Sequence, residues 1–517
     1  MKYLFLFCFL LVCTSTLFSQ TDLTGFEKYH TPYEQEILSN KKSTHLEQLM
    51  AMGEDASEER TLAVKEEIDA FVSEIKSSKL MRLSEVKLMK ALHKKVHERF
   101  LVRYKYISPF NEIFETGYYN CVSATALFAL VLEELNIPYN IQEQPTHVYI
   151  LAYPDTKAIS VEMTALKDAY YLPARKDISN AVALLLEFEI TSKEEIETFG
   201  ELQVYNAFYN TNSVVDLNQL AGIQYFNEAI MASNRNDLNA SLGEICKTLK
   251  LYNEEKIRLF KMEVLISLIA EAKFDCMKDI KYLIEYANIE KANKKKAGYE
   301  YATFIQEQLV SKGNKLLVDS SHTYIIQTVL DTTLLGQLNC FYYLGLSEYY
   351  SNAYNLKKKL EYAELAYNNL PDIPGASSIE LWLAQSILQN IEKYDSEKQL
   401  VKMNEYAVKY PFLRSHNLFM MGLFYVYTDV SGEYYGENDS EQGKIYFDLA
   451  LKTRDEMEDQ EVLDEEEVGW LFAEAGAYFI RKRLYKEALK VLEDGLKLSP
   501  DHERILARLE ILKDRMK

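Results

Sequence analysis

The sequence predicts two folded parts, an α+β domain followed by an all-helical solenoid. The first prediction rests on a long apolar helical segment that begins at Cys121 and is followed by two strand-like segments. The second rests on small and apolar residues that recur at helical spacing through the rest of the chain. The expected organisation is a leader over residues 1–20, the α+β domain with its N-terminal helices over 21–175, a helical linker region over 176–214, and helical repeats over 215–517.

Residues 1–20 have the pattern of a secretory signal peptide. One lysine near the start is followed by a short apolar run and a small, polar end, and the run is too short to span a bilayer. We therefore expect an exported protein, periplasmic or secreted, that is cleaved near Ser19 or Gln20. Alternatively, Cys13 mimics a lipoprotein cleavage box, although the valine before it is not small. No other run is long and apolar enough for stable membrane insertion.

Charge and cysteine content narrow the function classes. The 517 residues carry a formal net charge of −20, and because phosphate binding needs a basic face, we expect no nucleic-acid partner. Four cysteines remain after the leader, too few for a disulfide-dense scaffold at this length. They are Cys121, Cys246, Cys276 and Cys340. A bridge between Cys246 and Cys276 and a set of buried free thiols are the two alternatives.

Two amphipathic helices are expected ahead of Cys121, over 61–76 and 83–104. Their apolar residues recur at spacings of three and four, so both helices should pack behind the helix that begins at Cys121. His93 and His97 lie one turn apart on the second of them, which raises the question of a zinc site. The adjacent glutamate is off their shared face and no third ligand is evident, so we expect a surface or interhelix role and no metal.

Cys121 stands where a loop enters the apolar helix, with Asn120 as its N-cap. A side chain there lies over unpaired backbone N–H groups and the positive end of the helix dipole, and both favour thiolate over thiol. Cys121 is therefore a candidate nucleophile. The helix should end at 136–138. The preceding Tyr118 and Tyr119 either form a wall of the substrate site or anchor the loop.

Two strands are expected after this helix, over 147–153 and 158–162, joined by a turn over 154–157. Side chains alternate faces along a strand. A two-residue loop would place Glu162 opposite His147, and a four-residue loop would place it diagonal to His147. Both arrangements put the two side chains on one face, whereas an odd loop or a bulge would separate them.

These motifs resemble the core of the transglutaminase-like superfamily, which has a papain-like fold. The similarity lies in Gly-Tyr-Tyr-Asn-Cys121, the helix end Leu-Asn-Ile-Pro138, the strand start Thr-His147-Val-Tyr and the strand end Val-Glu162-Met-Thr. It covers about residues 80–164 and implies a Cys-His-carboxylate triad with no metal and no cofactor. In the family the acidic residue is more often Asp followed by Pro and Thr, and the His is typically followed by Ala-Trp. We interpret the glutamate as a variant, because its longer side chain still reaches an imidazole N–H.

The resemblance implies acyl transfer. Cys121 would attack an amide carbonyl, His147 would hold or take the thiol proton, and water or an amine would resolve the thioester. Glu162 would fix the histidine tautomer, and the backbone N–H of Cys121 would stabilise the oxyanion. Three side chains are candidates for the second oxyanion donor: Asn120, Gln142 and Gln144.

Helical repeats are clearest near the end of the chain, where small, aromatic and proline positions match the tetratricopeptide pattern. The matching residues are Phe472, Ala475, Gly476, Phe479, Ala488, Leu492, Gly495 and Pro500. A second match over 418–450 is interrupted by an expected polar loop at 431–440. Weaker helical pairs extend back to 217–252, and the acidic run 455–467 should form a solvated loop or helix edge.

Two functions fit the whole sequence. The first is an exported cysteine hydrolase or acyltransferase that acts on protein or peptide amides, with a concave repeat face that binds the substrate or a partner protein. The second is a catalytically inactive transglutaminase-like and tetratricopeptide scaffold for protein–protein interaction. Scaffolding that only covers the first domain is the alternative for the repeats. Amine-dependent cross-linking is a variant of the first function, because water and amines resolve the same thioester.

Overall fold

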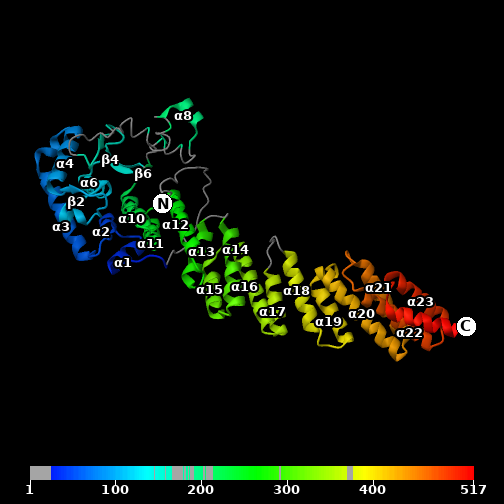
Figure 1. Cartoon of the computed structure of the whole chain (residues 1–517). Coiled ribbons are helices and arrows are strands. Elements are labelled where there is room, and N and C mark those ends of the chain that lie inside the picture. Colours follow the sequence, from blue (N-terminus) through cyan, green and yellow to red (C-terminus); the bar gives the residue numbers. More distant parts are fainter. Residues whose placement is uncertain are drawn as a thin grey trace. The chain divides into compact units, whose positions relative to one another are not determined.

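The chain divides into two compact units, Met1–Ala272 and Lys273–Lys517, coloured blue to green and green to red in Figure 1. The computed structural model describes residues 25–144, 146–157, 159–165, 179, 182–183, 186, 191–201, 204, 213–289, 293–369 and 376–516. The expected leader and most of the expected linker region lie outside the described residues. The described part is mostly helical, with small sheets in the first unit and helices alone in the second. This confirms the coarse prediction of an N-terminal part with helices and strands and a C-terminal part with helices alone.

Helices dominate the first unit, and several begin with a capping side chain. They are α1 (Pro32–Ser39), α2 (His45–Met50), α3 (Glu58–Ser77), α4 (Glu85–Arg99), α5 (Glu112–Thr116), α6 (Cys121–Glu134), α8 (Lys193–Phe199), α10 (Leu217–Asn234), α11 (Leu238–Leu251) and α12 (Glu255–Glu271), with a 3-10 turn at Lys79–Arg82. Thr31, Thr44 and Ser57 accept backbone hydrogen bonds at the starts of α1, α2 and α3. The expected helix over 61–76 is confirmed as part of α3.

The second N-terminal helix is shorter than predicted. We expected helix as far as Tyr104, but α4 ends at Arg99. The chain continues into β1 (Arg103–Tyr104), which pairs in parallel with β2 (Tyr118–Tyr119). Phe100 and Leu101 are buried although they lie beyond the helix. Their apolar character prolonged the helical pattern past its true end.

A four-stranded antiparallel sheet follows α6. Its strands are β3 (Tyr139–Gln144), β4 (His147–Ala152), β5 (Ile159–Val161) and β6 (Ser213–Val215), in the order β5-β4-β3-β6. We predicted β4 and β5 but not β3 or β6. The apolar helix α6 packs on this sheet, and Thr125 Oγ1 donates a hydrogen bond to the Val148 carbonyl at 3.4 Å.

Buried charges fasten the sheet and the N-terminal segment to the helices behind them. On β3, Glu143 accepts hydrogen bonds from Tyr252 Oη and Lys256 Nζ, both at 2.5 Å. In α11, the fully buried Lys247 lies 3.0 Å from Glu34 Oε1 and 2.9 Å from a Glu244 carboxylate oxygen. Such pairs are costly to break, because the remaining charge has no access to water.

The second unit consists of helices in the described ranges. They are α13 (Met277–Ile289), α14 (Asn293–Ile305), α15 (Lys315–Thr328), α16 (Thr332–Asn352), α17 (Leu356–Asn368), α18 (Ala376–Ile391), α19 (Ser396–Lys409), α20 (Asn417–Glu437), α21 (Ser440–Glu456), α22 (Glu465–Arg481), α23 (Tyr485–Leu498) and α24 (Glu503–Met516), with a π-helical turn at Gln306–Ser311 and a 3-10 turn at Pro411–Arg414. The expected polar loop at 431–440 is wrong, because α20 runs to Glu437 and only two residues connect it to α21.

Several helix pairs share the same turn. In α16–α17, α20–α21 and α22–α23, a residue with positive φ is followed by an N–H that bonds to the carbonyl five residues earlier, at 2.9 Å each time. This is the Schellman motif of a helix end, and α10–α11 of the first unit has it too. The bonded pairs are Asp237–Ala232, Asn355–Tyr350, Asp439–Tyr434 and Leu484–Phe479.

Small residues stand where paired helices approach closely. A Cβ at Gly476 would lie 2.4 Å from Leu492 Cδ2, and one at Gly495 would lie 2.6 Å from Phe472 Cβ. Both glycines belong to the repeat pattern read from the sequence. The pattern therefore marks helix–helix contacts of α22 and α23 in three dimensions.

Candidate active site

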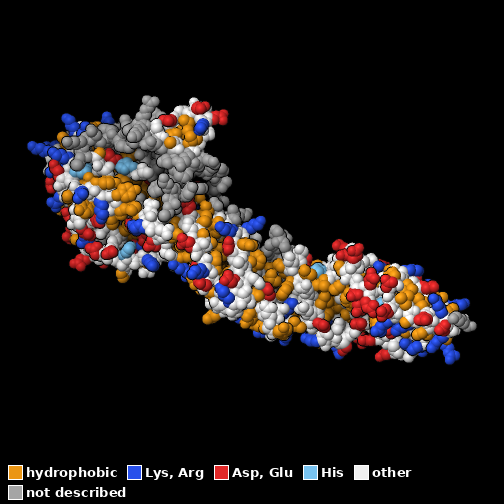
Figure 2. All heavy atoms as spheres, in the orientation of Figure 1, with side chains coloured by type: hydrophobic (Ala, Val, Ile, Leu, Met, Phe, Trp, Pro, Cys, Tyr) orange, Lys and Arg blue, Asp and Glu red, His pale blue; other side chains and the backbone are white. Residues whose placement is uncertain are grey.

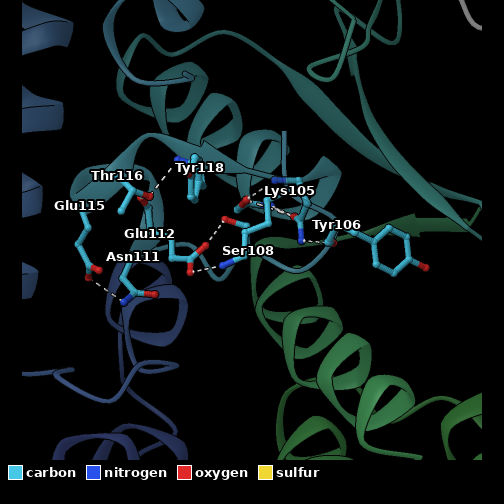
Figure 3. Close-up of polar contacts among 10 residues, drawn as sticks. Lys105, Tyr106, Ser108, Asn111, Glu112, Glu115, Thr116 and Tyr118 are labelled. Carbon is cyan, nitrogen blue, oxygen red and sulfur yellow. Dashed lines mark hydrogen bonds and ion pairs between the residues drawn. The ribbon is translucent and has the colours of Figure 1, made fainter. Parts of the chain in front are cut away.

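The segment between β1 and α6, which includes α5 and β2, is held by its own polar side chains (Figure 3). Glu112 in α5 accepts hydrogen bonds from Lys105 Nζ at 2.6 Å and from Ser108 Oγ at 2.7 Å. The loop turns at Gly117, whose φ is 76°, and a Cβ there would lie 2.3 Å from Val102 Cγ2. Glycine is required at this turn. The turn directs the chain into β2 and then into α6.

Cys121 is the first residue of α6, and Asn120 is its N-cap, as predicted. Asn120 Oδ1 accepts a hydrogen bond from the Ser123 N–H at 2.9 Å, and Ser123 Oγ accepts one from the Asn120 N–H at 3.0 Å. Asn120 Nδ2 also donates to the Tyr106 carbonyl at 3.3 Å. The cap thus joins the loop to the helix and fixes where the half-buried thiol of Cys121 lies, at the positive end of the helix dipole.

The register of the β4–β5 hairpin places Glu162 on the same face as His147. Ile150 pairs with Val161, so continuing the ladder by one step sets Glu162 opposite Tyr149 and diagonal to His147. This is the four-residue-loop arrangement that we considered from the sequence. Burial alternates along β4, with His147 on the half-exposed face.

The three side chains of the expected triad converge. His147 Nε2 donates a hydrogen bond to Glu162 Oε2, and the side chain of Cys121 lies close enough to His147 to raise its pKa. Because Nε2 faces Glu162, Nδ1 is the ring nitrogen left for the thiol. The His147 side chain is 25% exposed and that of Glu162 is 9% exposed, so the pair is shielded but still reachable.

Cys121 and Glu162 both raise the pKa of His147. Burial alone would lower the pKa of His147, but hydrogen bonding and the negative charges of Cys121 and Glu162 raise it to about 10. Burial alone would also raise the pKa of Glu162, but the hydrogen bond and positive charge of His147 lower it. At neutral pH the imidazole is therefore protonated, with a carboxylate on one side and the cysteine on the other.

A second set of contacts orients Glu162. Its Oε1 accepts hydrogen bonds from the Thr164 N–H at 2.8 Å and from Thr164 Oγ1 at 2.7 Å. Its backbone carbonyl lies 3.0 Å from His93 Nε2, which must carry the proton to donate to a carbonyl. The carboxylate and its backbone are thus both fixed.

His93 and His97 belong to α4, and their rings lie against the end of β5. This place differs from the expected surface or interhelix position. Their rings are 4.5 Å apart, and the His97 ring contacts Tyr119 edge-on at 5.8 Å. Burial lowers the pKa of His93, and burial together with the neighbouring His93 lowers that of His97 to about 4. Among the described residues, no third ligand joins them to form a metal site. The pair connects the strand of Glu162 with the loop of Cys121.

The structure shows where each candidate donor to an oxyanion lies. The Cys121 N–H lies at the start of α6, where the first N–H groups of a helix have no intrahelical acceptor. Asn120 uses Oδ1 as the cap and one N–H of Nδ2 to bond the Tyr106 carbonyl, so the second N–H of Nδ2 is its remaining donor. Gln142 pairs with Tyr149 and Gln144 pairs with His147 across β3 and β4, so both remain on the histidine face.

Tyr104 is a neighbour of the site that the sequence did not single out. It pairs with Tyr119 in β1–β2, and the two rings are 6.1 Å apart and nearly perpendicular. Burial, and next the negative charge of Cys121, raise the pKa of Tyr104. The sequence predicts helix over 103–104, so it gives no reason to place Tyr104 beside the site. Tyr119 is buried and anchors the loop, one of the two roles considered for it.

The four cysteines of the described chain are free thiols. Cys246 and Cys340 are buried, whereas Cys276 is exposed and Cys121 is half-buried. Of the two alternatives, the bridge between Cys246 and Cys276 is therefore wrong. Free thiols are confirmed, although Cys276 is exposed and not buried. Cys276 groups with Asp275 and Asp279 on the surface. Exposed acidic groups of this kind are common without any ion.

Two comparisons of the chain with known proteins gave no match. No family model matches the chain, and no curated protein matches it. A search of the described helices for a membrane span found none of sufficient length and apolarity.

Proposed function

We propose that this chain is a cysteine hydrolase or acyltransferase of the transglutaminase-like, papain-like type that acts on protein or peptide amides. The observation that carries the proposal is the convergence of Cys121, His147 and Glu162, from a helix start, a strand start and a strand end. A structural cysteine or histidine does not need this arrangement. Nucleophilic catalysis needs a base within hydrogen-bonding reach and a third group that orients the base.

In the proposed reaction, the Cys121 sulfur attacks the amide carbonyl carbon and a C–S bond forms. The carbonyl oxygen becomes an oxyanion, which the Cys121 N–H stabilises. His147 gives its proton to the leaving nitrogen as the C–N bond breaks, and a thioester remains. Water then attacks the thioester while His147 takes one of its protons. The C–S bond breaks, the acid is released, and the Cys121 thiolate beside protonated His147 is regenerated. An amine in place of water would give transfer instead of hydrolysis.

The electrostatics support this sequence of proton transfers. A thiolate–imidazolium pair is the reactive ground state of such enzymes, because the thiolate is the nucleophile. Glu162 stabilises the protonated ring of His147, and Thr164 holds the carboxylate oxygen that does not contact His147. The ring is therefore charged and correctly oriented before substrate binds.

For the second unit, we propose tetratricopeptide-like repeats that bind the polypeptide substrate or a protein partner. The recurring helix-pair turns and the close glycine contacts support a repeat architecture, and such repeats commonly bind peptides or helices. We also propose that the protein is exported, on the strength of the leader pattern in residues 1–20.

Competitive alkylation tests the catalytic proposal. Purified mature protein would be treated with limiting iodoacetamide at neutral pH, and labelling of each cysteine would be followed by mass spectrometry. Cys121 should react faster than Cys276, although Cys276 is more exposed. Equal or slower labelling of Cys121 would favour the inactive scaffold.

Product profiling is the second test. A library of peptides and unfolded proteins would be incubated with wild type, Cys121→Ala and the matched control Cys276→Ala, with and without a primary amine. Wild type and Cys276→Ala should give the same cleaved or amine-joined products, and Cys121→Ala should give none. Identical profiles for all three proteins would end the enzyme proposal.

A further inference from the structure

The outer edge of β1 has no strand partner among the described residues, and it lies near Cys121. The N–H groups of Val102 and Arg103 donate to the Gly117 carbonyl, and the N–H of Lys105 donates to the Tyr119 carbonyl. The residue between them, Tyr104, therefore turns its own N–H and C=O away from β2. Within the described part of the chain, β1 pairs with β2 alone.

The side chains along this edge are apolar at every second position. Val102 is 78% exposed, Tyr104 is 47% exposed and Tyr106 is 71% exposed. In Figure 3 the Tyr106 ring extends away from the other labelled residues. Figure 2 shows hydrophobic side chains gathered over the part of the first unit where Figure 1 labels β2. An exposed, apolar strand edge is a template for another strand and is otherwise a liability in a soluble protein.

The charges between the apolar positions indicate what could bind. Arg103 and Lys105 flank Tyr104, and both are exposed. Lys105 is paired with Glu112, whereas Arg103 has no ion pair among the described residues. An acidic side chain across from Arg103 would complement it, and a basic one would be repelled.

The same charges argue against a second copy of this chain as the occupant. If β1 paired with itself around Tyr104 in antiparallel fashion, Arg103 of one copy would lie opposite Lys105 of the other. Like charges directly opposite each other destabilise a strand pair. The edge therefore fits a different polypeptide better than it fits itself.

We propose that the outer edge of β1 binds the substrate as an added strand, and that the substrate is an extended polypeptide segment with apolar side chains at alternate positions around an acidic residue. This inference rests on the proposed function and specifies its substrate class. Tyr104 pairs with Tyr119, two residues before Cys121, and neighbouring strands lie about 4.8 Å apart. A strand added at the outer edge of β1 would therefore lie two strand spacings from β2. The edge would hold the substrate close to the site, and a neighbouring segment of the same polypeptide would reach Cys121.

Backbone recognition and side-chain recognition can be tested separately at Tyr104. Tyr104→Ala removes the ring but keeps the outward N–H. Tyr104→Pro removes both, and leaves the bonds to β2 intact because the Tyr104 N–H does not take part in them. Val214→Ala is the matched control, since Val214 is an exposed apolar residue on the edge strand β6.

Binding would be measured on full-length Cys121→Ala, so that no turnover occurs, with fluorescent ten-residue peptides. The peptides carry Phe-Glu-Phe, Phe-Lys-Phe or Ser-Glu-Ser at the centre. The Phe-Glu-Phe peptide should bind most tightly. Tyr104→Ala should raise its Kd about fivefold, in line with the loss of an aromatic contact. Tyr104→Pro should raise it more than about tenfold, because one net backbone hydrogen bond is lost as well, while Val214→Ala should leave it unchanged.

A charge-reversal variant shows whether a loss of binding comes from the edge or from misfolding. Arg103→Glu should switch the preference from the Phe-Glu-Phe peptide to the Phe-Lys-Phe peptide, which an unfolded protein cannot do. Unchanged binding by Tyr104→Pro, or an unchanged preference in Arg103→Glu, would overturn the inference. If the peptides bind as expected but wild type never modifies them, the proposed function fails and the strand-binding edge stands. If wild type modifies peptides with no effect of Tyr104→Pro, the function stands and the edge is not the substrate site.

Discussion

Replacing Glu162 by glutamine should remove the charge that keeps His147 protonated while leaving a side chain of the same shape. The change should lower the pKa of His147, because the hydrogen bond to the carboxylate and its negative charge are two of the four influences that raise it. The thiolate–imidazolium pair should then be less populated at neutral pH. Cys121 should lose reactivity although its own surroundings are unchanged.

The size of the expected effect on Cys121 reactivity follows from the pKa of His147. Its pKa is about 10 in the folded chain, against an ordinary value of 6.5. If glutamine removes about half of this elevation, the equilibrium between the ion pair and the neutral pair shifts roughly 50-fold, since a pKa change of one is a tenfold change in equilibrium. We therefore expect alkylation of Cys121 at pH 7 to slow by up to about 50-fold.

The assay is the rate of Cys121 alkylation from pH 5 to pH 10.5, read by mass spectrometry for each cysteine. In wild type the ion-pair region should extend to about pH 10, and in Glu162→Gln its upper limit should move to lower pH. Glu134→Gln, at the exposed end of α6, is the matched control and should behave as wild type. Cys276 provides an internal standard for reagent reactivity. The same rate and the same profile in Glu162→Gln would refute the electrostatic argument.

The same pair predicts how stability depends on pH. Glu162 has a lowered pKa, so its contribution to stability is present above its ordinary value of 4.5 and is lost as the pH falls. His147 has a raised pKa, so its contribution is complete below 6.5 and is lost as the pH rises towards 10. Denaturant unfolding should show the pair's contribution decline on both sides of pH 4.5–6.5. Glu162→Gln should flatten both limbs, and unchanged limbs would contradict the linkage.

Three further predictions concern the surroundings of the site and the repeats. His93→Phe should slow Cys121 alkylation across the pH range, because the carbonyl at the end of β5 loses its donor at 3.0 Å, and His93→Gln should restore part of the rate; no change in either variant would leave the histidine without a positioning role. Glu34→Gln should lower the free energy of unfolding by about 1–3 kcal/mol, because Lys247 would lose one of its two carboxylate partners and keep Glu244, and no loss in urea unfolding would contradict this. Gly476→Ala should cost about 1–3 kcal/mol through overpacking of α22 against α23, whereas Gly436→Ala, where nothing lies within 4 Å, should be neutral.

The site could be predicted from sequence where local chemistry dictates geometry. A cap, an apolar run and a helix-ending motif defined α6 and placed Cys121 at its start. Strand alternation and even loop length placed Glu162 on the histidine face, and the observed register agrees. Both inferences need only the period of one element and the length of one turn.

The parts that escaped prediction depend on contacts between distant segments. β1 has two residues, and it is a strand only because β2 lies beside it. β6 pairs with β3 across a long stretch of sequence. The role of His93 arises from a segment 69 positions away. The polar residues at 431–437 read as a loop, yet they continue α20, because Ser431 is buried and donates to the Gly443 carbonyl of the next helix.

The arrangement around Glu162 and Cys121 indicates that the two histidines of α4 position the residues of the proposed triad. A strand end and a loop that meet only through side chains can drift by an ångström, and such drift is costly for catalysis. His93 bonds to the backbone of Glu162, and His97 packs against both His93 and Tyr119. One helical turn of α4 thus touches the segment of the carboxylate and the segment of the nucleophile at once. Since burial keeps both rings uncharged near neutral pH, they hold the triad together without competing for the proton that His147 must carry.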